Sequence, residues 1–504
     1  MSTELVPPLA PAARTTAPAT VPATVPATAP ATAPATAPAR RWLRADPRSW
    51  ERARVAVTVA LLTGLVGLAV TVGADARWLA ALGAVIVRRG GVPAGVPFAA
   101  APQAHWANPL VLAELAFHLL ETSLGDRGLI LAQLACVAAA LAIAAADALA
   151  TARSRGGARA WAVPAALALV TIGALPSFAI ARVQMFSLVL FPALVALLRA
   201  ESRRRSRRIW LALPLLALWS NLHGAVLSGL LVLAVYLVLD RIRHQRVTAL
   251  MILIAAPLAI CVNPAGLGEA RYLQGLVTSV AAQRGAGMWG PLGSSPFDPV
   301  TVVAAVLLAI GIARSARPRL WELVVLAILA ALTVKAARDG VWLLLFMLAP
   351  SIRTARARKR SARTWNGLVP VGAVLALMLL VVATARVPRQ TGASRQAVAA
   401  AIRLAAGRPI LADAIPAEQL ALAGAQIWVG DPLDAFTRAT QVAYLDWIAG
   451  TATRAALGLE ADPRIGAILV SAGSAAARLA AADPALVAAD SDATAIVFVR
   501  RRPA

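Results

Sequence analysis

Apolar runs long enough to cross a lipid bilayer, or nearly so, recur along most of this chain and exclude an ordinary water-soluble fold. A bilayer core takes about 20 apolar residues per helix, and fewer where a segment is short or partly re-entrant, which predicts about eleven spans. Hydrophobic residues make up 59% of the 504 residues, above the usual share in soluble domains. The expected spans are 54–74, 128–150, 160–178, 183–199, 208–221, 224–240, 247–263, 299–314, 320–335, 339–352 and 366–385.

Basic residues gather in short clusters between these runs and predict the topology. The chain has 49 Lys and Arg against 24 Asp and Glu, a net charge of +25. Alternate loops carry most of the arginines, and basic loops stay in the cytoplasm. We therefore expect a multi-pass protein of the plasma (inner) membrane, with a cytoplasmic N-terminus and, after an odd number of spans, an extracytoplasmic C-terminus. The excess charge is read as a topology signal, so no nucleic-acid partner is expected.

Composition divides the chain into three parts. Residues 1–53 form a Pro/Ala/Thr-rich tail with a basic flank, expected to be disordered and cytoplasmic. Residues 54–385 are expected to form the transmembrane domain, with a long first outer loop at 75–127 whose second half, 108–124, has helical spacing. Residues 386–504 predict a small extracytoplasmic α/β domain with strands near 409–411, 426–429, 466–470 and 495–499. The fold class is therefore mainly α, a polytopic helical bundle with an α/β domain at its C-terminus.

The leading candidate for chemistry is Asp75, at the point where the first span emerges. A carboxylate there can act as a general base for an incoming hydroxyl group, or it can hold a divalent cation. The alternative is a helix-end cap paired with Arg77. Arg77 and Glu114, both in the first outer loop, are kept as candidate substrate-binding residues.

Other polar residues stand on outer connections where simple hairpins would not need them. Arg182 lies on a loop where the positive-inside bias predicts no arginine, so it is a candidate anion clamp. Asn221 and His223 lie in Trp219-Ser220-Asn221-Leu222-His223-Gly224 and could bind a phosphate or a sugar hydroxyl; the alternative is a polar turn whose Asn caps the next helix. Arg271 and Arg338 are candidate substrate-binding residues, with interfacial anchoring as the alternative.

Motifs for nucleotide cofactors are not found: the sequence has no Walker loop, no dinucleotide-binding glycine fingerprint and no His-Glu-x-x-His or Cys-pair motif. A divalent cation is therefore the one cofactor under consideration, and its ligands are not identified from the sequence.

The order of the outer-face motifs resembles bacterial multi-span membrane proteins related to the GT-C glycosyltransferases. The resemblance runs from about residue 55 to the end, and it departs from the commoner pattern because the first loop has no adjacent acidic pair. The motifs are Asp75-x-Arg77-Trp78, Gly90-Gly91-Val92-Pro93, Trp106-x-Asn108 leading to Glu114, Ala181-Arg182-x-Gln184-x-Phe186-Ser187, Trp219 to Gly224, Asn263-Pro264-x-Gly266, and Val429 to Phe436.

The resemblance implies a GT-C-like fold and a glycosyltransferase of envelope glycan biosynthesis. In that class an acidic residue of the first outer loop serves the acceptor hydroxyl or a metal, and Asp75 is the matching position. The implied partners are a sugar donor on a polyprenyl phosphate, membrane lipid, and an extracytoplasmic glycan or protein acceptor. A non-catalytic transporter or envelope-assembly scaffold is the alternative that the same spans permit.

Overall fold

The computed structural model of the chain describes residues 47–153, 161–315, 317–352, 369–385 and 392–501. Residues 1–46 of the expected tail lie outside this part, so that expectation is not tested there. Residues 47–53, expected as part of the basic flank, belong to helix α1 (Pro47–Ala69).

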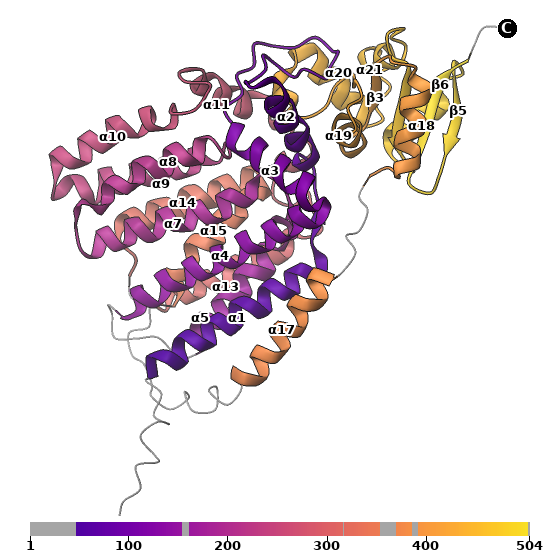
Figure 1. Cartoon of the computed structure of the whole chain (residues 1–504). Coiled ribbons are helices and arrows are strands. Elements are labelled where there is room, and N and C mark those ends of the chain that lie inside the picture. Colours follow the sequence, from indigo (N-terminus) through magenta and orange to yellow (C-terminus); the bar gives the residue numbers. More distant parts are fainter. Residues whose placement is uncertain (1–46, 154–160, 316, 353–368, 386–391, 502–504) are drawn as a thin grey trace, which may run out of the picture. The chain divides into compact units, whose positions relative to one another are not determined.

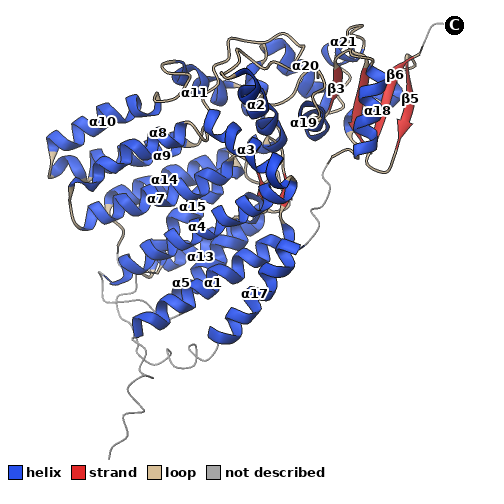
Figure 2. Ribbon diagram, viewed as in Figure 1, coloured by secondary structure: helices blue, strands red, loops and turns tan. Residues whose placement is uncertain are grey.

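A helix occupies every apolar run expected from the sequence (Figures 1 and 2). Among the described residues, three helices are long and apolar enough to cross a membrane, within Ser49–Ala69, Asp126–Ala152 and Gln184–Arg203. The chain is thus a membrane-embedded helical protein, while the count of eleven spans is not confirmed. The helices of the bundle are α1, α4 (Asp126–Arg153), α5 (Ala162–Gly173), α6 (Leu175–Phe178), α7 (Gln184–Arg203), α8 (Ala212–Ser220), α9 (Val226–Leu239), α10 (Arg246–Ile260), α13 (Asp298–Ala313), α14 (Leu320–Lys335), α15 (Gly340–Ser351) and α17 (Val369–Ala385).

Packing in the bundle follows from small and branched apolar side chains that face neighbouring helices. Helix α4 is rich in Ala and Leu, both strong helix formers, and it packs along α7. Its buried residues include Leu134, Leu141 and Ala145. Helix α1 packs along α17, where Gly64 allows close approach because a Cβ atom there would lie 2.8 Å from the Cβ of Leu379.

The first outer loop contains two helices. The expected helix over 108–124 is α3 (Val111–Leu124), whereas α2 (Ala76–Arg89) was not anticipated. The two pack together at Gly83, since a Cβ atom at this position would lie only 2.2 Å from the backbone oxygen of Glu114. Further connections between helices of the bundle contain α11 (Gly268–Thr278), α12 (Val280–Arg284), η4 (Gly287–Trp289) and η5 (Ala337–Asp339).

A small α/β domain follows the last helix of the bundle. Its four strands lie in the order β3-β4-β6-β5, with β3 parallel to β4 and the other two pairs antiparallel. Three expected strands are found, the one expected at 426–429 forms only isolated bridges through Ile427, and β5 was not expected. The elements are α18 (Arg395–Ala405), β3 (Ile410–Ala412), α19 (Ala414–Leu422), η7 (Leu433–Ala435), α20 (Arg438–Ile448), α21 (Arg454–Glu460), β4 (Ala467–Ser471), α22 (Ala475–Ala482), β5 (Leu486–Ser491) and β6 (Ala495–Arg500).

The core of this domain is not made by the domain alone. Trp78 and Leu82 of α2, together with Val96 from the first outer loop, are buried in the same hydrophobic cluster as the strands. The loop backbone also pairs with the domain, since Ala101 N–H donates to the carbonyl of Trp428 at 2.9 Å. The first outer loop and the C-terminal domain therefore form one folded layer.

A two-residue parallel ladder links the first outer loop to a second connection of the bundle. Strand β1 (Thr71–Val72) pairs with β2 (Ile180–Ala181), and the N–H of Gly73 donates to the carbonyl of Ala181 at 3.0 Å. A Cβ atom at Gly73 would lie 2.1 Å from Cγ2 of Ile180, so this contact needs a glycine. The ladder places residues 75 and 182 on neighbouring loops.

Candidate active site

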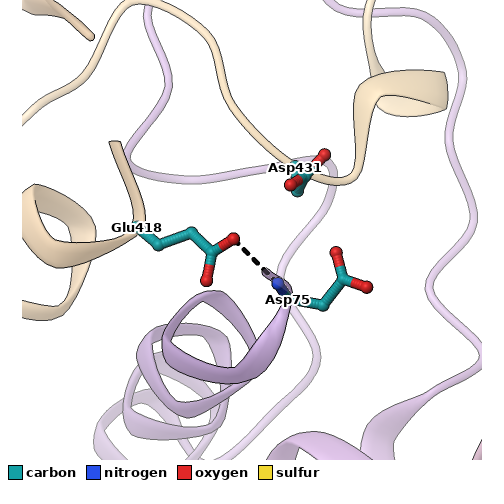
Figure 3. A group of neighbouring side chains, drawn as sticks. All are labelled: Asp75, Glu418 and Asp431. Carbon is teal, nitrogen blue, oxygen red and sulfur yellow. Dashed lines mark hydrogen bonds between the residues drawn. The ribbon is translucent and has the colours of Figure 1, made fainter. Parts of the chain in front are cut away.

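Three carboxylates from two distant parts of the chain meet at the start of α2. Asp75, Glu418 of α19 and Asp431 offer oxygen atoms that all lie within 4.8 Å of one another (Figure 3). Of these three residues, the sequence singles out only Asp75 as a candidate for chemistry. The commoner acidic pair of the first loop is absent here, and the C-terminal domain supplies the neighbouring carboxylates instead.

The backbone at Asp75 is held in an unusual conformation. Its φ angle is 75°, in the left-handed region that non-glycine residues seldom adopt, and its side chain makes no helix-capping hydrogen bond. Its N–H instead donates to Oε1 of Glu418 at 2.7 Å. The expected alternative, a cap paired with Arg77, is therefore not what the structure has, because Arg77 binds Asp126 at 2.9 Å.

Burial and mutual repulsion favour the protonated forms of these acids. The pKa of Asp75 is raised by burial, although the guanidinium groups of Arg182 and Arg338 oppose the shift. Burial, together with the charges of Asp431 and Asp75, raises the pKa of Glu418 well above its usual value. For Asp431, burial and the charge of Asp75 raise the pKa to about 8. A positive charge among the three oxygens would relieve this repulsion.

The trio fits an oxygen-liganded divalent cation. Glu418 is fully buried, and its Oε2 has no hydrogen-bond partner among the residues that the structure describes. A buried carboxylate oxygen without a partner is costly, and a bound cation or proton would satisfy it. Hard cations such as Mg²⁺ and Mn²⁺ prefer carboxylate ligands of this kind.

Cationic and neutral donors approach Asp75 from other loops. Arg182 follows β2, Arg338 lies in η5, and both interact electrostatically with the carboxylate of Asp75. The guanidinium of Arg338 stacks over the ring of Trp289, with its central carbon 3.6 Å from the ring centroid. The charges of these arginines, after burial, lower the pKa of His223 to about 3, so this imidazole is uncharged at neutral pH. Arg182, Arg338 and His223, three of the predicted substrate-binding residues, are thus brought together.

A short relay orients the ring of His223. The indole N–H of Trp219 donates to Oγ of Ser187 at 2.7 Å, and the same Oγ lies 2.7 Å from Nδ1 of His223. The hydroxyl oxygen of Ser187 accepts from the indole, and its own proton is available for donation to Nδ1. In the tautomer with that donation the ring proton lies on Nε2, where His223 offers an uncharged N–H donor beside two arginines.

Two further groups complete the site and were missed from the sequence. Tyr272 of α11 is buried, and its pKa is raised well above its usual value by burial and by the charges of Asp434, Glu269 and Asp75. Asp434 accepts a hydrogen bond from the indole of Trp106 at 3.2 Å. Neither residue carries a local signal, because each reaches Asp75 only through the tertiary fold.

The remaining predicted residues are placed elsewhere or given a structural partner. Asn221 ends α8 and donates to the carbonyls of Ala217 and Val262, so it does not cap the next helix. Glu114 is buried and accepts two bonds of 2.8 Å from the amide of Asn108. The side chain of Arg271 is exposed on α11, and nothing in the described part of the chain draws it to Asp75.

No family model matches the sequence, and no curated protein matches it. Among solved structures, the chain is similar to ArnT from Cupriavidus metallidurans bound to undecaprenyl phosphate, with 12% identity, a TM-score of 0.49, and coverage of 89% of this chain and 98% of that one. Because the likeness is distant, the function is argued below from this chain's own residues.

Proposed function

We propose that the protein is a glycosyltransferase that moves a sugar from a polyprenyl-phosphate donor to an extracytoplasmic acceptor. The observation that carries this proposal is the division of charge around Asp75. Carboxylates of Glu418 and Asp431 lie on one side, and Arg182, Arg338 and the neutral donor His223 lie around it. Displacement at an anomeric carbon requires one group that accepts the proton of the acceptor hydroxyl. It also requires a neighbouring group that stabilises the departing phosphate.

In the proposed reaction, the acceptor oxygen bonds to the anomeric carbon while the bond from that carbon to the phosphate oxygen breaks. The acceptor proton passes to the carboxylate of Asp75, whose raised pKa makes it a stronger base than an exposed aspartate. The departing phosphate gains negative charge, which Arg182, Arg338 and the Nε2 proton of His223 stabilise. When bound by the carboxylate trio, a divalent cation would polarise the acceptor hydroxyl.

The topology that suits this reaction is the one expected from the arginine distribution. About eleven spans, a cytoplasmic N-terminus and an extracytoplasmic C-terminus would place the site on the outer side of the membrane. A lipid-linked donor needs no nucleotide site on the protein, in agreement with the sequence motifs. Envelope glycan synthesis is the process that such a transferase would serve.

The decisive experiment compares Asp75→Asn with Arg88→Ala in the full-length protein. Asn keeps the shape of the side chain and loses its charge, so transfer from polyprenyl-phosphate sugars should fall by at least about a hundredfold, with membrane insertion unchanged. Arg88 lies exposed at the far end of α2, so Arg88→Ala should leave the rate of sugar transfer unchanged. An Asp75→Asn protein that keeps full transfer would rule out the catalytic role and favour the scaffold or transporter alternative.

A further inference from the structure

A basic hollow lies at the end of the bundle opposite the candidate active site. It is formed where α7 and α9 end and where α14 begins, it is open to the outside, and its volume is about 420 Å³. Helix α7 starts two residues after Arg182 and runs for 20 residues, so its ends are roughly 30 Å apart. That length matches the hydrocarbon thickness of a bilayer, so the hollow and the candidate active site belong to opposite membrane faces.

Positive charge exceeds negative charge around this hollow. Four arginines line it, namely Arg203, Arg205, Arg243 and Arg319. The one lining carboxylate, Asp240, is shared by Arg205 and Arg319 at 3.3 Å each, longer than the roughly 2.7–2.9 Å of a tight charge-assisted bond. An additional anion can therefore bind without displacing a strong ion pair.

Some donor capacity in the hollow is unused. The side chain of Arg243 is exposed, and no ion pair is found for it in that same part of the chain. Guanidinium groups bind phosphate oxygens through paired N–H donors, so a phosphate is the anion that this set suits.

The rim of the hollow is apolar, which points to a lipid as the source of the phosphate. Leu320 is 50% exposed beside Arg319, and Leu239 also lines the opening. A soluble anion would gain nothing from these side chains, whereas the first carbons of acyl chains would pack on them. Basic pockets between membrane helices are suited to acidic head groups.

We propose that this hollow binds the phosphate of an anionic membrane lipid, at the bundle end where the arginines gather. The site uses none of the residues assigned to sugar transfer, so it stands independently of the proposed function. The bound head group would neutralise the surplus guanidinium charge between α7, α9 and α14, and would thereby stabilise the packing of these three helices.

The test measures lipid binding to the full-length protein in a neutral detergent, by native mass spectrometry and by thermal unfolding. Phosphatidylglycerol should bind and raise the unfolding midpoint. Phosphatidylcholine at the same concentration should not, because its choline cancels the charge. Inorganic phosphate should also have little effect. Equal effects of the two lipids would overturn the proposal, and an effect of inorganic phosphate equal to that of phosphatidylglycerol would overturn the assignment to a lipid.

Matched variants locate the binding. Arg243→Gln, which removes an exposed side chain and so should not disturb folding, should weaken phosphatidylglycerol binding about tenfold. Arg243 plus Arg205, both replaced by Gln, should weaken it further. Arg246→Gln, which removes an exposed arginine three positions away that does not line the hollow, is the control. An equal loss in Arg246→Gln and Arg243→Gln would show general surface attraction and would contradict the site.

Discussion

The backbone N–H of Asp75 donates to Oε1 of Glu418 at 2.7 Å, across 343 positions of the chain. This bond fixes the candidate base against a carboxylate of the C-terminal domain. It also explains how Asp75 holds its left-handed backbone conformation, since the bond gives the strained residue a buried partner.

Removing the charge of Glu418 should weaken cation dependence. In Glu418→Gln the side-chain carbonyl can still accept from Asp75, but one of three negative ligands is lost. We expect the Mg²⁺ or Mn²⁺ concentration for half-maximal transfer to rise at least about tenfold. Glu460→Gln is the matched control, because Glu460 is buried in the same domain, accepts from Trp447 and likewise has a buried Oε2 without a partner. A similar rise in both variants would contradict a cation site at the trio.

Separating β1 from β2 should reduce transfer by moving Arg182. A Cβ atom at Gly73 would meet the side chain of Ile180, so Gly73→Ala should push the two loops apart and raise the KM for the donor severalfold. Ile180→Ala removes the atom that clashes. The double variant should therefore recover a large part of the lost activity, and failure to recover would show that the glycine matters for another reason.

The ring orientation of His223 should depend on Ser187. In Ser187→Ala the proton donor to Nδ1 is lost, the other tautomer becomes accessible, and we expect a severalfold higher KM for the donor with little change in expression. Ser220→Ala is the control, because that hydroxyl only bonds back to the carbonyl of Ala217 in its own helix. Nitrogen NMR of labelled histidine would report the tautomer directly, and an Nδ1-protonated ring in the unaltered protein would contradict the relay.

Glu114 should make the protein less stable as the pH rises. Burial raises its pKa from 4.5 to about 7, so the folded protein holds the proton more tightly than the unfolded chain does. Stability should therefore fall between pH 4.5 and about pH 7 and then level off, by up to about 3 kcal/mol. Glu114→Gln should flatten that fall, as measured by unfolding midpoints across this range. An unchanged pH profile would show that Glu114 is not the group responsible.

The sequence predicts the helices well because each depends on its own apolar run. It also singles out Asp75, Arg182, His223 and Arg338, since ionisable groups at outer connections have no reason to be there in a simple hairpin. Local sequence patterns do not reveal contacts between residues that are far apart in the chain. Glu418 sits in an alanine-rich helix with nothing nearby to mark it.

Strand prediction failed where pairing depends on distant segments. Ile427 forms only isolated bridges, because its partners Ala99 and Ile410 come from two different segments. Strand β5 was overlooked because its sequence, Leu486 to Ser491, is mostly exposed and shows no alternation of apolar and polar residues. Likewise, Arg77 was assigned to substrate, since its partner Asp126 becomes adjacent only when α2 folds back toward α4.

The shared core of the first outer loop and the C-terminal domain has a consequence for biogenesis. Trp78 and Val96 leave the ribosome well before the strands that share their hydrophobic cluster. Until the C-terminal domain has folded against the first outer loop, Asp75 lacks both carboxylate neighbours and its backbone partner. If the proposed function is right, a partly synthesised chain should therefore have no transfer activity.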